Sequence, residues 1–405
     1  MRALPILAAL ALTAPACFFE LGELVESETG SGGGGAGAGG AGAGGGPSST
    51  STTGAGGGIP SDWWDDRFLH RLRIDLVGVA ADVADARLPV VLPSDFAYGD
   101  ALSDGSDLRF VDDDGTTPLG YEIERFDALA GTLIWVRVPE VSSGGDHIWL
   151  YYGRPDALAQ SDPAAVWGGY QGVYHLAEDP SQASAIADAS PNQNDGTPTG
   201  FSAGASVEGR HGLAIDFGPS AMRSVVIDDD DGFSVGAGED LTIELWFKWD
   251  PAGGGGYFVA KEACCVGYAA LMLATNGILR QTWRSGSCCA MPPEGDYTFT
   301  QRSLPGNESD RDWHHAVLIW DRSVSQTARW YLDGMLWQED AIDAAPGQGG
   351  SGQLRLGADF SGAGSFSGII DEMRFAKRIY GLPEIQLNQA AAEGSLLSFG
   401  SVESL

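Results

Sequence analysis

The chain has 405 residues, and its 23 Lys and Arg against 55 Asp and Glu give a formal net charge of −32. This balance argues against nucleic acid as a partner, because phosphates require a basic surface, and against charge-driven adsorption to anionic lipid headgroups. The length that remains after a leader and a low-complexity segment is enough for two domains, each with its own core.

The first residues predict export. A single arginine precedes the apolar residues 4–16, and small residues stand before Cys17. Such a run is typical of a secretory signal peptide and is too short to span a bilayer. Residues 14–17 (Ala-Pro-Ala-Cys) resemble the lipobox of bacterial lipoproteins, although that motif usually has Leu three positions before the cysteine. We expect residues 1–16 to be a signal peptide and Cys17 to be lipidated, at the outer membrane or cell surface. An ordinary signal cleaved nearby, with an incidental cysteine, is the alternative.

Residues 17–60 are expected to form a flexible tether behind the lipidated cysteine. Residues 30–58 are nearly all Gly, Ala, Ser and Thr. Such a segment has little surface to bury and cannot offset the entropy cost of ordering. About thirty residues of this composition have an r.m.s. reach of roughly 30 Å. Lipid, tether and folded domains together describe a protein displayed away from a membrane.

The rest of the chain predicts an all-β fold. Short runs of alternating apolar and polar residues are separated by Gly, Asp and Pro, which is typical of sandwiches or barrels. Turn sequences such as Asp333-Gly334 favour hairpins. The best helix candidate is residues 382–394, with a proline near its start. The clearest predicted strands are residues 72–76, 133–138, 148–152, 241–249, 316–320, 329–332 and 353–356.

A small, polar segment divides the folded part in two. Residues 157–165 are mostly small or polar, and an apolar block opens at residue 172. We place the boundary at residues 156–167. The predicted domains are therefore a β-sandwich over residues 61–158 and a second one over residues 168–400.

The first of these blocks resembles a bacterial domain of unknown function that often precedes concanavalin A-like modules in secreted proteins. The matching features lie in order along residues 63–155. They are Trp64 with Arg67, the runs at 106–110 (Ser-Asp-Leu-Arg-Phe), 114–117 (Asp-Gly-Thr-Thr), 121–124 (Tyr-Glu-Ile-Glu) and 134–139 (Ile-Trp-Val-Arg-Val-Pro), and 151–153 (Tyr-Tyr-Gly). The resemblance implies a scaffold and brings no known activity.

The second block resembles the laminin G-like and pentraxin-like members of the concanavalin A-like sandwiches. Six pieces in the right order carry the resemblance: residues 188–197, 212–217, 241–247, 313–317, 331–334 and 368–374. The resemblance implies a jelly-roll sandwich. Members of the family mostly bind carbohydrate or protein, and some accompany hydrolases as accessory domains, so the fold alone does not fix the function.

Some relatives of this sandwich cleave polysaccharides with two acidic residues that alternate along one strand, a geometry that suits retaining hydrolysis. The corresponding strand here has one acidic residue, Glu244. Asp371 and Glu372 are adjacent, which predicts opposite faces of a strand. Glu122 and Glu124 do alternate, but we interpret them as solvent-facing residues of a half-buried strand. No catalytic pair is therefore predicted. We expect a protein that binds a glycan or protein ligand, with a polysaccharide hydrolase or its accessory subunit as the alternative.

Calcium is the expected cofactor, in a structural role. Carboxylates and loop carbonyls suit this hard cation, but the Asp runs do not have the spacing of an EF-hand. The family resemblance implies a calcium ion near the chain ends, bound by an acidic residue at the start of the last strand. Asp371 matches that position, and Asp188 and Asp216 are the further candidate ligands. A turn former and an edge-strand aspartate are the alternative interpretations of these two.

Histidines and cysteines complete the candidate residues. The adjacent His314 and His315 open a predicted core strand, so we expect one of them to be buried and hydrogen-bonded. The four cysteines after the signal peptide predict two disulfides between two doublets, because an even count is typical of exported proteins. Zinc is less suitable, since neither doublet has the usual two-residue spacer. The doublets are Cys264 with Cys265 and Cys288 with Cys289.

Overall fold

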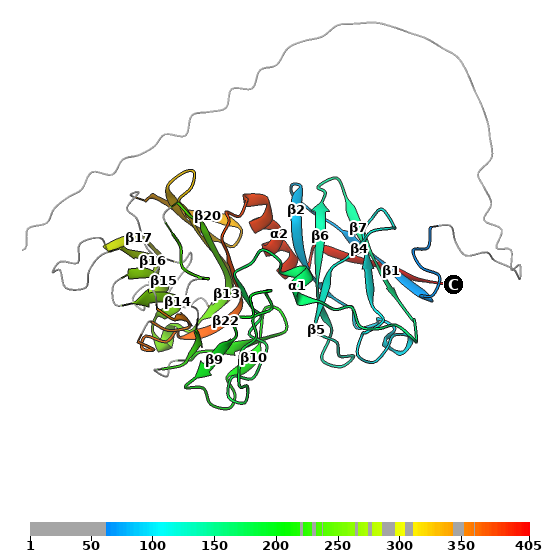
Figure 1. The fold of residues 1–405 in the computed structure, drawn as a ribbon, viewed down its shortest axis with the longest axis horizontal. Helices are drawn as coiled ribbons and strands as arrows, with labels where there is room; N and C mark the ends of the chain where they lie inside the picture. The colour runs from blue at the N-terminus through cyan, green and yellow to red at the C-terminus, as the bar shows by residue number, and fades with distance from the viewer. Residues whose placement is uncertain are drawn as a thin grey trace, which may run out of the picture. The chain divides into compact units, whose positions relative to one another are not determined.

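The computed structural model describes residues 62–405 except for 219–221, 229–231, 237, 264–265, 274–277, 286–295, 304–310, 343–351 and 360. Antiparallel strands in four sheets make up most of this part of the chain (Figure 1). They form two sandwiches, which confirms the predicted fold class.

The first sandwich packs a sheet of five strands against a sheet of three. The larger sheet has the order β23 (Leu397–Ser404), β1 (His70–Leu76), β7 (Asp146–Tyr152), β3 (Arg109–Val111) and β4 (Pro118–Leu119). The smaller sheet has the order β2 (Val83–Val91), β6 (Leu133–Val141) and β5 (Tyr121–Arg125). Alternate residues of β1, such as Leu72 and Ile74, point into the core between these sheets, and the residues between them point away from it.

The second sandwich packs a sheet of eight strands against a sheet of seven. The first has the order β10 (Ser206–Glu208), β11 (Leu213–Asp216), β22 (Gly368–Ala376), β13 (Leu241–Trp249), β18 (Trp313–Asp321), β19 (Thr327–Leu332) and β20 (Met335–Ala341), with β8 (Gly172–Tyr174) also paired to β22. The second has the order β17 (Asp296–Ser303), β16 (Ile278–Ser285), β15 (Val266–Leu273), β14 (Gly256–Ala263), β21 (Leu354–Leu356), β12 (Ser224–Ile227) and β9 (Gly196–Thr199). Residues Ile243, Leu245 and Phe247 of β13 are fully buried between them.

Local sequence explains the best-predicted elements. Strand β13 spans residues 241–249, as the alternation predicts. The Asp333-Gly334 pair forms the two-residue turn between β19 and β20, and Leu332 pairs with Met335 across it. Both turn residues have positive φ, at 50° and 75°. Asp and Gly adopt this conformation at low cost, which is why the dipeptide predicts a hairpin.

The helices lie between the two sandwiches (Figure 1). They are α1 (Pro163–Val166) and α2 (Leu382–Ala392). Elsewhere the chain forms two 3₁₀ turns, η1 (Tyr98–Asp100) and η2 (Pro251–Gly253). Trp135 of β6 and Trp167 after α1 pack in one buried cluster with Ile319 of β18 and Ile385 of α2. In the described part of the chain, no helix combines the length and the apolar character needed to cross a membrane.

The last strand corrects the predicted extent of the second sandwich. Residues up to 400 were predicted to belong to it, but β23 pairs with β1 in the first sandwich, with Leu72 opposite Val402. Before β23, Leu387 and Leu396 already pack in the core of the first sandwich. Pairing between residues more than 300 positions apart leaves no signal in local alternation, so the sequence could not predict this return.

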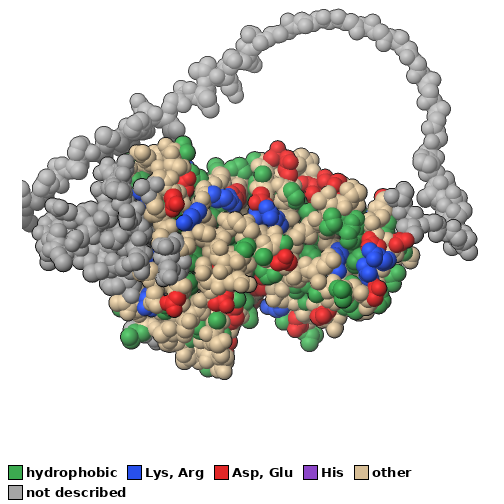
Figure 2. Space-filling view, in the orientation of Figure 1, with side chains coloured by type: hydrophobic (Ala, Val, Ile, Leu, Met, Phe, Trp, Pro, Cys, Tyr) green, Lys and Arg blue, Asp and Glu red, His purple; other side chains and the backbone are tan. Residues whose placement is uncertain are grey.

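Residues 58–405 form one compact unit. On the visible face of its described residues, acidic, basic and apolar side chains are interspersed (Figure 2). The acidic excess is thus spread over this surface and not gathered into one tail, in agreement with the scattered Asp-rich turns of the sequence.

Candidate functional site

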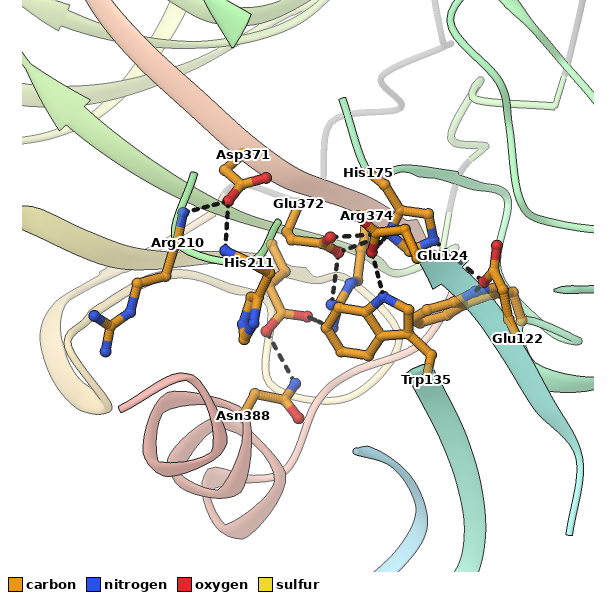
Figure 3. Close-up of polar contacts among 12 residues, drawn as sticks. Glu122, Glu124, Trp135, His175, Arg210, His211, Asp371, Glu372, Arg374 and Asn388 are labelled. Carbon is orange, nitrogen blue, oxygen red and sulfur yellow. Dashed lines mark hydrogen bonds and ion pairs between the residues drawn. The ribbon is translucent and has the colours of Figure 1, made fainter. Parts of the chain in front are cut away.

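A cluster of charged side chains is buried where the two sandwiches meet (Figure 3). The first sandwich contributes Glu122 and Glu124 of β5, and the second contributes His175 after β8 together with Glu372 and Arg374 of β22. We call these five residues the junction cluster. Glu122, His175, Glu372 and Arg374 are all less than one-tenth exposed. The prediction that Glu122 and Glu124 face solvent is therefore wrong, because the second sandwich covers this part of β5.

His175 is the centre of the junction cluster. Its Nδ1 lies 2.9 Å from Oε1 of Glu372 and 3.7 Å from Oε2 of Glu124. Its Nε2 lies 3.2 Å from Oε2 of Glu122. Burial alone lowers the pKa of His175, but the charges of Glu372, Glu122 and Glu124 outweigh it and hold the pKa well above the ordinary value. The ring is therefore an imidazolium that donates to carboxylates of both sandwiches.

Two indoles also donate to the glutamates of the first sandwich, and their rings lie against the guanidinium of Arg374. Nε1 of Trp135 donates to Oε2 of Glu124 at 2.8 Å, and Nε1 of Trp167 donates to Oε2 of Glu122 at 2.5 Å. The guanidinium of Arg374 lies 4.5 Å and 4.9 Å from the centres of the two indole rings. It also donates to Oε2 of Glu372 at 2.9 Å. This geometry combines an ion pair with cation–π contacts.

Glu244 of β13 extends the buried network toward α2. Its Oε1 lies 2.7 Å from Nε2 of His315 and accepts from Nδ2 of Asn388 at 2.9 Å. Burial would raise its pKa, but Arg374 and His315 lower it to about 2, so Glu244 is ionised. His315 is fully buried, which confirms the prediction for one histidine of the pair. Glu244 is only 1% exposed, so its carboxylate is closed to a solvent-borne substrate.

A β-bulge changes the predicted orientation of the two acidic residues of β22. The register between β13 and β22 shifts where Glu244 lies opposite Arg374 and Trp246 lies opposite Asp371. Glu372 lies in the bulge with a φ of 50°. Alternation is broken there, so Asp371 and Glu372 both point to the side covered by the first sandwich (Figure 3). The prediction that they occupy opposite faces is wrong.

The carboxylate of Asp371 is hydrogen-bonded to backbone amides in this structure. Its Oδ2 accepts from the amides of Arg210 and His211 at 2.6 Å and 2.9 Å, in the loop between β10 and β11. Complete burial and the nearby charge of Glu372 raise its pKa well above the ordinary value. The side chain thus fixes a loop that contacts the first sandwich, where the ring of His211 packs at 5.2 Å against Trp135.

The other two candidate calcium ligands also accept from backbone amides, Asp188 in a loop and Asp216 at the end of β11. Asp188 accepts from the amides of Val173 and Asn194, each at 2.9 Å, and Asp216 accepts from the amide of Gly218 at 2.8 Å. Within the described ranges, two groups of three residues have possible ligand atoms within 4.8 Å of one another. They are Glu124, His175 and Glu372 in the junction cluster and the more exposed Asp113, Asp146 and His147. Neither includes Asp188, Asp216 or Asp371.

The remaining predicted sites, Cys17 and the two cysteine doublets, lie outside the described residues. Next to the doublets, β15 and β16 pair in antiparallel fashion, with Val266 opposite Ser285. The strand ends at Val266 and Ser285, which lie next to the two doublets in the sequence, are thus neighbours.

The junction cluster has the chemistry of a closed ion-pair network. Its charged groups form hydrogen bonds and ion pairs with one another, and aromatic rings lie against its cations. Sequence analysis missed His175 and Arg374 as members of this network. Arg374 did carry a signal, because a charged residue inside the apolar strand at residues 368–376 is rare unless it is paired.

Comparison with known families agrees with this organisation. Residues 104–185 match a domain of unknown function (DUF2341), and residues 223–386 match the concanavalin A-like lectin/glucanases superfamily. The two matches confirm the predicted resemblances and their order. No curated protein matches the chain.

Similar solved structures include two binding domains. The receptor binding domain of botulinum neurotoxin C/D mosaic serotype is 10% identical, with a TM-score of 0.42, and the match covers 56% of this chain and 51% of that one. The binding domain of Paraclostridial Mosquitocidal Protein 1 is 14% identical, with a TM-score of 0.42, and the match covers 55% of this chain and 52% of that one. The chain thus spans about half the length of each.

Proposed function

We propose that this chain is an exported, membrane-anchored protein that binds a glycan or protein ligand through its second sandwich without cleaving it. The observation that carries the proposal is the state of Glu244. Hydrolysis requires two carboxylates that reach the scissile bond from an open cleft. Glu244 is instead buried against His315, Asn388 and Arg374. The match of residues 223–386 to a lectin/glucanase superfamily supports ligand binding by this sandwich.

The outer face of the eight-stranded sheet is covered, and this limits where a ligand could bind to the second sandwich. On the outer face of the eight-stranded sheet, Glu244 of β13 contacts Asn388 of α2, and Arg374 of β22 contacts Trp135 of the first sandwich. A ligand of the second sandwich would therefore bind to the loops or edges of this domain and not to the centre of its eight-stranded sheet.

A glycan array probed with the purified full chain, with and without calcium, tests the binding proposal. A parallel assay measures new reducing ends from the glycans that bind. We expect retention on the array without release of reducing ends. Cleavage that Glu244→Gln abolishes would overturn the proposal and favour a hydrolase.

The anchor is tested by Cys17→Ser. We expect the native chain to fractionate with membranes and the variant to appear in the soluble fraction, because the acyl chains are attached through the cysteine. Two or more acyl chains are needed for stable anchoring, so their loss has a large effect. Cell fractionation and immunoblotting measure the distribution. A variant that stays with the membranes would contradict lipidation at Cys17.

The cysteine doublets are expected to form two disulfides between Cys264 or Cys265 and Cys288 or Cys289. Each closes a loop of about 25 residues and should contribute on the order of 3 kcal/mol by the loop-entropy model. Mass spectrometry of unreduced peptides from exported protein identifies the bonds. Free thiols at these four positions would rule them out.

Calcium remains a predicted structural cofactor, with Asp371 as the candidate ligand. A cation that binds only the folded chain should raise its melting temperature, by a stabilisation of roughly 2.7 kcal/mol at a hundredfold excess over the dissociation constant. Thermal melts with calcium and with a chelator measure this change. Asp371→Asn, which keeps the size of the side chain, should remove the calcium response. An unchanged response would rule out Asp371.

A further inference from the structure

A groove lined by tryptophans lies on the outer face of the five-stranded sheet in the first sandwich. Trp63 and Trp64 come from the segment before β1, and Trp149 projects from β7 on the side away from the core. All three are partly exposed, and the groove has a volume of about 400 Å³. The solvent-facing side of an antiparallel sheet is usually polar, so this group of aromatic rings is unusual for a surface. Part of their surface packs against Phe68 and Tyr151, and the remainder faces the groove.

Arg71 fixes the rings in place. Its guanidinium lies 4.7 Å from the centre of the Trp63 ring and 4.1 Å from that of Trp149. Its Nε donates to Glu403 at 2.8 Å, and its Nη2 donates to Asp62 at 2.9 Å. The arginine is only 5% exposed. The aromatic surface is therefore rigid before any ligand binds, which lowers the entropy cost of binding. The two carboxylates also neutralise the arginine.

Polar side chains border the tryptophans. Asp113, Thr116 and His147 line the same groove. His147 also lines a second groove of about 440 Å³, which continues along the sheet past Arg73 and Asp75. Together the grooves offer an aromatic surface at one end and hydrogen-bonding groups along the rest. Each lies in the size range of small-ligand sites.

We propose that this groove is a second ligand site, which binds an uncharged oligosaccharide. A pyranose ring has an apolar C–H face that fits an indole surface, and a rim of hydroxyls that fits carboxylates and imidazole. Charge favours a neutral chain over an acidic one, because Asp62, Asp113 and Asp114 outnumber the paired Arg71 in the lining. The continuation past His147 provides length for more than one sugar unit. This site is separate from any site on the second sandwich.

Isothermal titration of the purified full chain tests the site. The neutral probes are cellohexaose, maltohexaose and chitohexaose, and the acidic probe is a hexamer of galacturonate. We expect at least one neutral hexamer to bind and the acidic hexamer to bind at least tenfold more weakly. Trp149→Ala should reduce the affinity for the neutral hexamer at least tenfold, and Trp149→Phe should retain part of it. Asp113→Ala, at an exposed position on the rim, should reduce it about threefold.

The matched control is Trp313→Ala, which removes a partly exposed tryptophan from the second sandwich. It should leave the affinity unchanged. Circular dichroism identifies variants that fail to fold, and Asp113→Ala supplies the test if Trp149→Ala is one of them. If a hexamer binds and neither Trp149→Ala nor Asp113→Ala changes its affinity, the groove is not its binding site. The proposal for the second sandwich would then stand. Failure of all three neutral hexamers to bind would overturn the groove as a site for uncharged oligosaccharides.

Discussion

Replacing Arg374 with methionine is expected to lower the free energy of unfolding by about 3–5 kcal/mol. The guanidinium is the common partner of Glu372 at 2.9 Å and Glu244 at 3.6 Å, and both carboxylates are buried. Methionine has a similar length and can fill the space between the indoles of Trp135 and Trp167. The loss therefore measures the cost of leaving two buried carboxylates without their cation more than the cost of a cavity.

Chemical denaturation monitored by tryptophan fluorescence measures this change. Arg73→Met is the matched control, because Arg73 is exposed on β1 and pairs with Asp75, which is also exposed to solvent in part. We expect its effect to stay within about 0.5 kcal/mol. Adding Glu372→Gln to Arg374→Met should recover part of the loss, since one of the two buried carboxylates that lose the guanidinium is removed. A loss below about 1 kcal/mol for Arg374→Met alone would contradict the description of the junction cluster as a tightly coupled ion-pair network.

Local sequence patterns were sufficient to predict the strands whose two faces have different surroundings. Residues 241–249 alternate because one side of β13 faces the core of the sandwich and the other faces α2 and its neighbours. The Asp333-Gly334 turn was predictable because its backbone conformation is a property of two adjacent residues. One histidine of the pair His314 and His315 was predicted to be buried and hydrogen-bonded, but Glu244, the partner of His315, is 71 residues away, so its identity could not be predicted.

The junction cluster depends on contacts that no local pattern contains. Glu122 and Glu124 alternate like solvent-facing residues of a strand, and only the docking of the second sandwich buries them. The bulge at Glu372 places two adjacent carboxylates on one side, against the period of two that governs regular strands. Local periodicity alone predicts solvent exposure for Glu122 and Glu124 and opposite faces for Asp371 and Glu372.

The network also explains why the first sandwich and the second act as one folded unit. After the chain has completed the second sandwich, β23 pairs with β1 of the first sandwich. The contacts of His175 with Glu122 on one side and Glu372 on the other then join the two sandwiches through buried charge. A change in the protonation of this cluster should therefore alter the stability of the whole unit.

The substitution Glu124→Gln is expected to remove part of the pH dependence of the free energy of unfolding. Burial, with smaller contributions from Glu372 and Glu122, raises the pKa of Glu124 from 4.5 to about 7 in the folded protein. Between these values the folded chain holds a proton that the unfolded chain has released, so the free energy of unfolding falls as pH rises through this window. The change for this residue is about 3 kcal/mol. Glutamine resembles the protonated acid in shape and can still accept from Trp135, so it should remove this loss.

The expected result is a difference between native and variant that depends on pH. The two should be similarly stable near pH 4.5, and the variant should be more stable by about 3 kcal/mol at pH 8. Burial lowers the pKa of His211 to about 4, so its contribution is lost as pH falls from 6.5 toward 4. That loss affects both proteins and cancels in their difference. Glu140→Gln, at an exposed site on β6, serves as the matched control. A difference for Glu124→Gln that does not change with pH would mean that Glu124 titrates at the same pH in the folded and unfolded chains.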